Sequence, residues 1–337
     1  MLTRIGIMGF GRIGRNFFRN VHGRKDLEVA AIVDIVEPRS VAYLLQFDTV
    51  HGRFHEPVSV KGDSMYVGGR QIRVLNRRQP GDVNWAELGI DIVIESTTMY
   101  RTRAWLEKHL EAGARRVILT VPPKDTIDCM VVMGVNDHEL KAEHRVLSIG
   151  SATANCLAPI VKILNEAFGI ERGFMTTVHA YTNDQRLADV PHTDLRRSRS
   201  AAENIIPTET WAPIAVQQIL PDLAGRLNGM AMTVPVPDGS TVDLTTWLKK
   251  NASVEEVNEA VRTAAAGSLK NIVDYCDEPI VSSDVIGRSH SAIFDSLCTR
   301  VLGGNLLKTI SWYDNGWGYS SRVVDLCLKL AQFDGKE

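Results

Sequence analysis

The hydrophobic pattern of the first 150 residues alternates short β-branched runs with longer stretches of helical periodicity. The strand-like runs lie at 4–8, 28–33, 90–95, 116–120 and 130–133. Strands that alternate with helices in this way usually form a parallel sheet with helices on both faces. The pattern therefore predicts an α/β fold here, a Rossmann-type doubly wound parallel sheet.

The segment 58–75 departs from this rhythm. It contains three short alternating runs separated by Gly-Asp and Gly-Gly pairs. Such pairs between alternating runs are typical of hairpin turns. We therefore expect a small antiparallel excursion inside the otherwise parallel sheet.

The pattern changes after residue 156. A helical stretch is followed by longer alternating strands at 173–181, 231–236 and 241–248. Such alternation is typical of an antiparallel sheet that is covered on one face, so a second domain of α+β type with a mainly antiparallel sheet is expected. The polar, arginine-rich segment 182–207 is long for an irregular connection, and such segments are usually functional. Residues 318–333 have the pattern of a final helix.

Composition and charge narrow the class of protein. The 337 residues, 44% hydrophobic and 23% charged, suffice for two domains with their own cores. A net charge of −2 gives no field that would attract nucleic acid or anionic lipid, so neither is an expected partner. No apolar stretch resembles a signal peptide or a membrane span, which predicts a cytoplasmic protein. The five cysteines form no C-x-x-C pair and are expected to be mostly small buried residues rather than disulfides or zinc ligands, and no metal site is predicted.

A glycine motif points to a dinucleotide. Gly9, Gly11 and Gly14 follow a predicted strand and open a predicted helix, and Asp34 closes the next strand. The first glycine permits the tight turn, the second lets the backbone approach a pyrophosphate, and the third lets helix and strand pack closely. A carboxylate at Asp34 can accept hydrogen bonds from ribose hydroxyls but repels a 2′-phosphate. NAD is therefore expected rather than NADP.

Several motifs spread along the chain resemble those of phosphorylating glyceraldehyde-3-phosphate dehydrogenases. They are GFGRIGR at 9–15, FDTVHGRF at 47–54, SATANCLAP at 151–159, TTVHAYTNDQR at 176–186, DLRRSR at 194–199 and SWYDNGWGYS at 311–320. The resemblance implies an NAD-binding domain at 1–151, a catalytic domain at 152–317 and a helix at 318–337 that returns to the first domain. It also implies a homotetramer in which 182–207 lies beside a neighbouring subunit's cofactor.

The resemblance also implies roles for individual residues. His179 matches the family's general base, and Asn315 matches the asparagine that orients the nicotinamide carboxamide. Pro191 matches a residue typical of NAD-selective members. The implied cofactor contacts are Gly9, Gly11, Arg12, Ile13, Gly14, Asp34, Thr97, Thr120, Pro191, Asn315 and Tyr319.

The family's catalytic cysteine is missing, because the nucleophile position is Ala152. A methyl group cannot attack an aldehyde, so this chain is expected to be inactive or severely impaired in forming 1,3-bisphosphoglycerate and NADH from glyceraldehyde 3-phosphate, phosphate and NAD. Cys156 is four residues further along a predicted helix, about 6 Å away. That exceeds the near-attack distance of roughly 3.5 Å, and Cys156 is expected to be a buried structural thiol.

Two anion sites are implied for the substrate phosphate and for inorganic phosphate. The matching positions are Ser151, Thr153, Thr182, Asp184, Arg197, Thr210 and Thr233. Thr233 differs from the family pattern, because an arginine is expected there, and Trp211 replaces the glycine that normally follows Thr210. Met8, Thr98 and Gly316 also depart from the usual asparagine, glycine and glutamate.

Three interpretations of the sequence remain open. Ala152 could be an introduced replacement in an NAD-dependent dehydrogenase, which makes the chain a catalytically dead Cys-to-Ala form. The chain could instead be a natural NAD-binding pseudoenzyme, which the changes at Thr233, Trp211 and Gly316 favour. It could also be a dehydrogenase of another phosphorylated aldehyde, such as erythrose 4-phosphate.

Overall fold

The computed structural model describes residues 2–335, and the chain divides into two compact units. Unit 1 comprises the chain up to residue 131, residues 137–150 and the segment from residue 320 onward. Unit 2 comprises residues 132–136 and 151–319. Unit 1 is therefore built from both ends of the chain.

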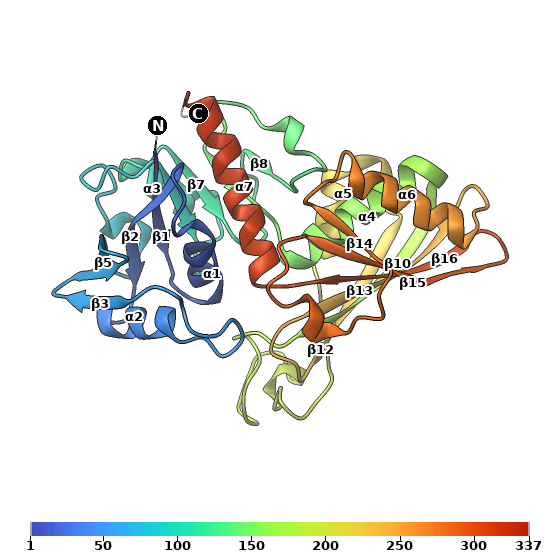
Figure 1. The fold of residues 1–337 in the computed structure, drawn as a ribbon, viewed down its shortest axis with the longest axis horizontal. Coiled ribbons are helices and arrows are strands. Elements are labelled where there is room, and N and C mark those ends of the chain that lie inside the picture. The colour runs from blue at the N-terminus through green and yellow to red at the C-terminus, as the bar shows by residue number, and fades with distance from the viewer. Residues whose placement is uncertain (1, 336–337) are drawn as a thin grey trace. The chain divides into compact units, whose positions relative to one another are not determined.

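Unit 1 contains a nine-stranded sheet in the order β3-β4-β5-β2-β1-β6-β7-β9-β8 (Figure 1). Its strands are β1 (Thr3–Met8), β2 (Leu27–Asp34), β3 (Val58–Lys61), β4 (Ser64–Val67), β5 (Arg70–Asn76), β6 (Ile92–Glu95), β7 (Arg116–Leu119), β8 (Cys129–Met130) and β9 (Val146–Ser148). All neighbours pair in parallel except β3–β4 and β4–β5. The predicted doubly wound sheet and its antiparallel excursion are thus confirmed.

Four helices belong wholly or mainly to unit 1: α1 (Arg12–Val21), α2 (Pro38–Gln46), α3 (Arg103–Glu111) and α7 (Trp317–Phe333). The strand order reverses between β1 and β6. In open parallel sheets, ligands bind beyond the carboxyl ends of the strands at such a reversal. The glycine motif between β1 and α1 lies at this point.

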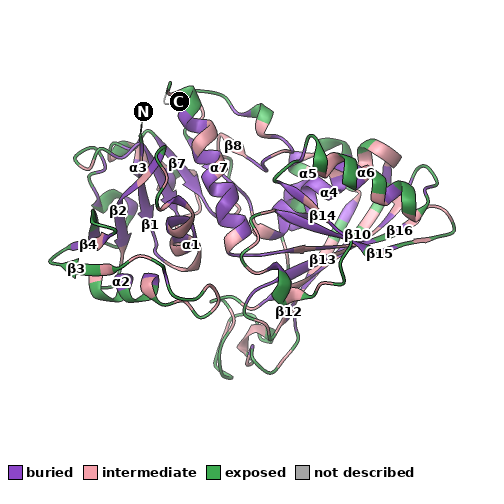
Figure 2. Ribbon diagram, in the orientation of Figure 1, coloured by how far each residue is buried: buried purple, intermediate pink, exposed green. Residues whose placement is uncertain are grey.

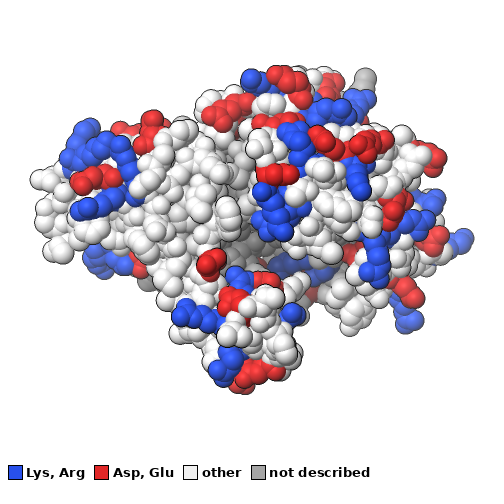
Figure 3. All heavy atoms as spheres, turned by 180° about the vertical axis from the view of Figure 1, so that it is seen from behind, with Lys and Arg blue, Asp and Glu red and all other residues white. Residues whose placement is uncertain are grey.

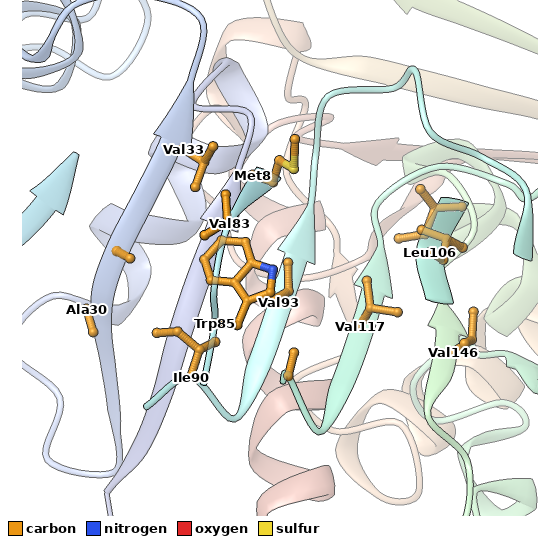
Figure 4. Packing of buried hydrophobic residues seen from close by; sticks show 13 residues of the cluster. Met8, Ala30, Val33, Val83, Trp85, Ile90, Val93, Leu106, Val117 and Val146 are labelled. Atoms are coloured by element: carbon orange, nitrogen blue, oxygen red, sulfur yellow. The ribbon is translucent and has the colours of Figure 1, made fainter. Parts of the chain in front are cut away.

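Strands β1 and β2 are mostly buried (Figure 2). The core of unit 1 centres on Trp85 (Figure 4), which is fully buried. Met8, Val33, Val93 and Val117 of the parallel strands belong to the same cluster (Figure 4). A Cβ at Gly6 of β1 would come within 2.6 Å of the Trp85 ring, so only glycine fits beneath the indole. The long buried runs in these strands follow from coverage of both sheet faces.

The last helix is tied to the rest of unit 1. Arg116 at the start of β7 forms a 2.6 Å ion pair with Asp334, just past the end of α7. Lys329 of α7 pairs with Asp137, and the Ser320 hydroxyl donates to the carbonyl of Ile13 at 3.5 Å. These contacts join α7 to the part of unit 1 that precedes residue 151 in the sequence.

Unit 2 contains a seven-stranded sheet in the order β11-β12-β10-β13-β16-β15-β14. Its strands are β10 (Ile170–Ala180), β11 (Ile206–Thr208), β12 (Leu227–Val234), β13 (Ser240–Leu248), β14 (Val273–Cys276), β15 (Ala292–Leu302) and β16 (Leu306–Tyr313). The pairings are antiparallel apart from β10–β12 and β14–β15. This is the mainly antiparallel sheet that the alternating pattern predicts.

Three helices lie together on one side of the unit 2 sheet (Figure 1): α4 (Ala152–Phe168), α5 (Ala212–Ile219) and α6 (Val254–Ala266). Ser253 caps α6 in a reciprocal capping box with Glu256. Short 3₁₀ turns occupy Pro80–Asp82, Asp137–Glu139, Arg196–Ser198, Pro221–Leu223 and Ser282–Val285.

The surface carries both signs of charge. On the face that Figure 3 shows, lysine and arginine are interspersed with aspartate and glutamate. Within residues 2–335, no helix is both long and apolar enough to cross a membrane. The five cysteines are all unpaired, and three of them, Cys156, Cys276 and Cys327, are buried.

Candidate cofactor and catalytic sites

The turn after β1 has the geometry of an anion cradle. Gly9 has a φ of +89°, and a Cβ there would lie 2.8 Å from the backbone of Ser96. A Cβ at Gly14 would lie 2.4 Å from the Gly9 carbonyl oxygen, whereas one at Gly11 would meet nothing within 4 Å. Gly9 and Gly14 are thus required by packing inside unit 1. The open space at Gly11 is where a ligand can approach the backbone.

The first turn of α1 contains no acidic side chain that would repel an anion. Gly11 is its N-cap, no side chain caps it, and it carries no acidic residue in the first turn. The exposed N–H groups and the helix dipole at such an end favour an anion. Arg12 and Ile13 form the start of this helix, so the turn fits the pyrophosphate of a dinucleotide.

Asp34 is held beside this turn at the end of β2. Its Oδ2 accepts the Phe10 N–H at 2.7 Å, and its Oδ1 accepts the Ile35 N–H at 2.7 Å. Each carboxylate oxygen keeps a second lone pair for a hydroxyl donor. The backbone therefore fixes the carboxylate where β2 ends, the place at which the family motif positions the adenosine ribose.

A buried polar network supports the end of β6. Glu95 is fully buried, and its Oε1 accepts from the Thr97 N–H at 2.9 Å and the Thr97 hydroxyl at 2.5 Å. Its Oε2 lies 3.1 Å from Nε2 of the fully buried His109. The Trp85 indole donates to Nδ1 of His109 at 3.1 Å, so Nε2 carries the proton and donates to Glu95.

This network brings two predicted cofactor contacts to neighbouring strand ends. Thr97 follows β6, and the Thr120 hydroxyl after β7 donates to the Glu95 carbonyl at 3.2 Å. The sequence offered no signal that Trp85 and His109 support Thr97, because the three residues lie on separate elements.

Ala152 is the first residue of α4. Ser151 is the N-cap, and its hydroxyl accepts the Ala154 N–H at 3.1 Å. A helix amino terminus stabilises a thiolate, so this position is suited to a nucleophilic cysteine, which the sequence lacks. Cys156, one turn later, is fully buried with its thiol 3.8 Å from the Ser311 carbonyl oxygen, and burial raises its pKa far above the usual value. It offers no substitute nucleophile.

His179 of β10 is oriented through one of its ring nitrogens. Its Nδ1 lies 2.6 Å from the carbonyl oxygen of Ala180. A carbonyl only accepts, so Nδ1 donates this hydrogen bond. The imidazole edge packs on Tyr313 with ring centres 6.0 Å apart. Nε2 is therefore the ring nitrogen at which a proton can be exchanged.

Tyr313 links the α4 start to this strand. Its hydroxyl lies 2.8 Å from the Thr153 hydroxyl and 2.9 Å from that of Thr177. Burial raises the pKa of Tyr313 well above its usual value, so the phenol stays neutral. Thr153, next to Ala152, and His179 therefore contact the same buried ring.

The side-chain amide of Asn315 is oriented through its oxygen, and its nitrogen can donate to a ligand. Its Oδ1 accepts the Ser240 hydroxyl at 2.8 Å, and the Ser240 oxygen accepts the Ala180 N–H at 3.0 Å. The Nδ2 group has no hydrogen-bond partner among residues 2–335. An oriented amide with free N–H donors fits the carbonyl of a carboxamide.

Three of the predicted anion residues, Thr182, Asp184 and Arg197, lie within the segment 182–207. Arg197 forms ion pairs with Asp184 and, at 3.3 Å, with Asp194. The Thr182 hydroxyl donates to Gln185 at 3.0 Å. Because two carboxylates neutralise Arg197, an arriving phosphate has to displace at least one of them.

Trp211 forms a wall next to these residues. It is 59% exposed and precedes α5, and Thr210 accepts the Ala212 N–H at 3.3 Å. A surface hollow of about 740 Å³ is lined by both residues together with Arg197, Glu209 and Ile214. The indole therefore forms part of the lining of this hollow.

Thr233 provides no charge to the site. It is 3% exposed and stands opposite His179 in the parallel pairing of β12 with β10. Of the other predicted contacts, Pro191 is exposed in the segment 182–207 and Tyr319 is buried in α7.

Comparison with known proteins identifies the family. The NAD-binding domain of glyceraldehyde 3-phosphate dehydrogenase matches residues 3–103, and the C-terminal domain of the same enzyme matches residues 151–315. The chain belongs to the glyceraldehyde-3-phosphate dehydrogenase family. The resemblance that the motifs indicate is thereby confirmed, and the amino-terminal region is the family's NAD-binding domain.

Similarity to individual glyceraldehyde-3-phosphate dehydrogenases extends over nearly the whole chain. The enzyme of Geobacillus stearothermophilus is 51% identical over 332 residues, which cover 98% of this chain and 99% of the relative. That of Mycobacterium avium is 50% identical over 333 residues, with 97% and 98% covered. That of Borreliella burgdorferi is 49% identical over 336 residues, with 98% and 100% covered.

Proposed function

We propose that this chain binds NAD and a phosphorylated aldehyde as a glyceraldehyde-3-phosphate dehydrogenase does, and that its covalent step is severely impaired. The reaction is the conversion of glyceraldehyde 3-phosphate, phosphate and NAD into 1,3-bisphosphoglycerate and NADH. The observation that carries the proposal is Ala152 at the first position of α4, followed by Thr153, whose Tyr313 partner also packs on His179. The base is retained and the nucleophile is not.

The proposed roles follow the geometry of each unit. Bound NAD supplies the hydride acceptor. The open backbone at Gly11 and the uncapped start of α1 hold its pyrophosphate, and Asp34 accepts from its ribose hydroxyls and disfavours NADP. Asn315 donates to the carboxamide through Nδ2. His179 accepts through Nε2 the proton that the aldehyde-derived hydroxyl loses.

The substrate and phosphate sites are proposed on the residues of unit 2. Arg197 receives a phosphate by exchanging an aspartate for it, which retains its charge pairing. The hydroxyls at the start of α4 and α5 add neutral donors. The proposed contacts are Ser151, Thr153, Thr182, Asp184, Arg197, Thr210 and Thr233.

The wider biology is proposed on the same basis. We expect a cytoplasmic homotetramer in which 182–207 contacts a neighbouring subunit, with no nucleic-acid or membrane partner. We also propose 1–151 as the NAD-binding domain, 152–317 as the catalytic domain and 318–337 as the helix that returns to the NAD-binding domain. Size-exclusion chromatography with light scattering tests the oligomeric state directly.

A second candidate is an NAD-binding pseudoenzyme. Two residues favour it. Thr233, buried opposite His179, carries no charge for a triose phosphate, and the indole of Trp211 reduces the space in the hollow. A related dehydrogenase of erythrose 4-phosphate would share the NAD site and differ in this hollow.

Restoring the nucleophile distinguishes these functions. Ala152→Cys should raise NADH formation from glyceraldehyde 3-phosphate and phosphate by at least about 100-fold, because the thiol opens the covalent route. Ala152→Ser is the matched control and should stay near the starting rate, since a hydroxyl at this position is a far weaker nucleophile. Absorbance at the NADH band measures both.

Each outcome selects one function. NAD binding without any gain in Ala152→Cys, with either aldehyde, supports the pseudoenzyme. A gain with erythrose 4-phosphate alone supports the related dehydrogenase. Failure of arsenate to replace phosphate in an active variant would contradict the phosphorolysis step, and a lack of NAD affinity would reject the whole proposal.

A further inference from the structure

Two histidines and a glutamate meet on unit 1, in a place that the dehydrogenase function does not use. His22 ends α1, and His55 and Glu56 follow α2 in the loop before β3. One ligand atom from each of the three side chains lies within 4.8 Å of those from the other two. His22 and Glu56 are half-buried, and His55 is exposed.

Aromatic packing holds the two imidazoles in place. The His22 ring stacks on Phe18 with centres 5.9 Å apart and meets Phe54 edge-on at 5.2 Å. The His55 ring lies 5.8 Å from that of His22 and 4.7 Å from that of Phe54. The helix end and the loop are therefore brought together before any ligand binds.

Glu56 lies against the same position from a third side. A Cβ built on Gly68, in the turn between β4 and β5, would lie 3.4 Å from Glu56 Oε2 and 3.6 Å from His22 Cε1. The carboxylate and the imidazole thus flank one glycine. None of the three ligand side chains has a hydrogen bond to the other residues between 2 and 335, so their lone pairs are available.

We propose that His22, His55 and Glu56 form a binding site for a divalent transition-metal ion of the zinc type. Two imidazole nitrogens and one carboxylate oxygen form a donor set typical of zinc, with water as a fourth ligand. An ion at the centre of the present triangle would lie at most about 2.8 Å from each atom, so side-chain shifts of under about 1 Å reach the bond lengths of 2.0–2.2 Å. Magnesium and calcium, which prefer all-oxygen sites, do not fit.

Arg70 and His22 line the same small surface hollow. The positive charge of Arg70 therefore repels a cation that is bound at His22. Removing this charge in Arg70→Gln should strengthen metal binding several-fold. An ion that binds elsewhere on the protein would not respond to this substitution.

The test is a titration of the metal-free chain with Zn²⁺ and, for its visible spectrum, with Co²⁺. His55→Gln and Glu56→Gln should each weaken the binding by about 10–100-fold, as loss of a ligand or its support does. His138→Gln, which removes an exposed histidine elsewhere on unit 1, is the matched control and should bind as the parent does. Calorimetry gives affinity and stoichiometry, and Co²⁺ spectra report nitrogen and oxygen coordination.

Clear results would overturn the proposal. It fails if the parent chain binds no Zn²⁺ at about 100 μM, or if both ligand variants keep the parent's affinity and stoichiometry. His55 is exposed, so His55→Gln should fold normally, and circular dichroism of each variant checks this. The outcome does not depend on Ala152, and NAD is absent from the assay.

Discussion

Thr98 has a backbone conformation that its side chain disfavours. Its φ is +66°, and it is exposed beside Thr97 after β6. A β-branched residue in the left-handed region costs roughly 1–2 kcal/mol, because its Cβ crowds the carbonyl oxygen. The family pattern commonly has glycine here, so the strain is a property of this chain.

We predict that Thr98→Gly raises the free energy of unfolding of unit 1 by about 1 kcal/mol, since relief of strain outweighs the added freedom of the unfolded chain. Asn271→Gly is the control. Asn271 also has positive φ, at 65°, but asparagine tolerates that region, so little change is expected. Urea unfolding measures both, and an unchanged midpoint for Thr98→Gly would show that the backbone is relaxed.

Single residues differ in how far the sequence reveals their role. Gly9 and Gly14 could be predicted from their spacing in one strand–turn–helix motif, although the Ser96 backbone that excludes a Cβ at Gly9 lies outside that motif. The metal-site histidines could not, because His22 and His55 are brought together by packing of α1 on the following loop. Ser240, which orients Asn315, likewise acts across two strands.

At the scale of elements, the end of β6 depends on a buried charge. Glu95 is satisfied by Thr97 and by His109 of α3. We predict that His109→Leu destabilises unit 1 by about 3 kcal/mol, because it leaves a buried carboxylate with one fewer donor. Trp85→Phe removes only an indole N–H and some volume and should cost about 1–2 kcal/mol. Denaturant unfolding gives both values, and equal losses would argue against a charge-supporting role for His109.

Asp128 connects α3 with the β8–β9 edge. Its carboxylate accepts from Arg103 at 2.6 Å and from the Arg145 and Val146 N–H groups at 2.7 and 2.9 Å. Burial acts to raise the pKa of Asp128, but the Val146 N–H and Arg103 outweigh it, so the pKa lies below the usual value. The carboxylate therefore stabilises the fold above the pKa of the unfolded state, near 3.9, and this contribution is lost as pH falls through the lower folded-state pKa.

Asp128→Asn should accordingly cost about 1 kcal/mol at pH 7, and its difference from the parent should shrink below about pH 4. Asp26→Asn is the comparison, because Asp26 pairs with Arg24 at an exposed position and should change stability by under about 0.5 kcal/mol. Urea unfolding at several pH values measures the effect. A pH-independent loss would mean that shape rather than charge is responsible.

Helices and strands could be predicted where a single hydrophobic periodicity extended over the whole element. The long α4 and the alternating β10 and β13 could be predicted because their burial follows one period. The strand expected at 130–133 shrinks to Cys129–Met130, since residues 132–136 belong to unit 2. Such limits are set by tertiary contacts that a local pattern does not contain.

At the scale of the whole molecule, the two units should respond differently to the cofactor. NAD contacts proposed on the glycine turn and Asp34 lie in unit 1, so NAD at about 100 times its Kd should stabilise that unit by about 2.7 kcal/mol. NADP at the same concentration should have a much smaller effect, because Asp34 repels its 2′-phosphate. Calorimetry with each cofactor tests this, and equal shifts would contradict the role of Asp34.

The return of α7 to unit 1 also orders events during synthesis. Arg116 leaves the ribosome long before Asp334, and residues 151–319 of unit 2 come between them. Asp334 lies 218 residues after Arg116, so at 5–20 residues per second this interval lasts roughly 11 to 44 seconds. Unit 2 is contiguous over this stretch and can fold first, whereas the nucleotide-binding unit has to wait for its last helix. A nascent chain that stalls before residue 320 would therefore carry an incomplete unit 1, with the surface that α7 covers open to chaperones and proteases.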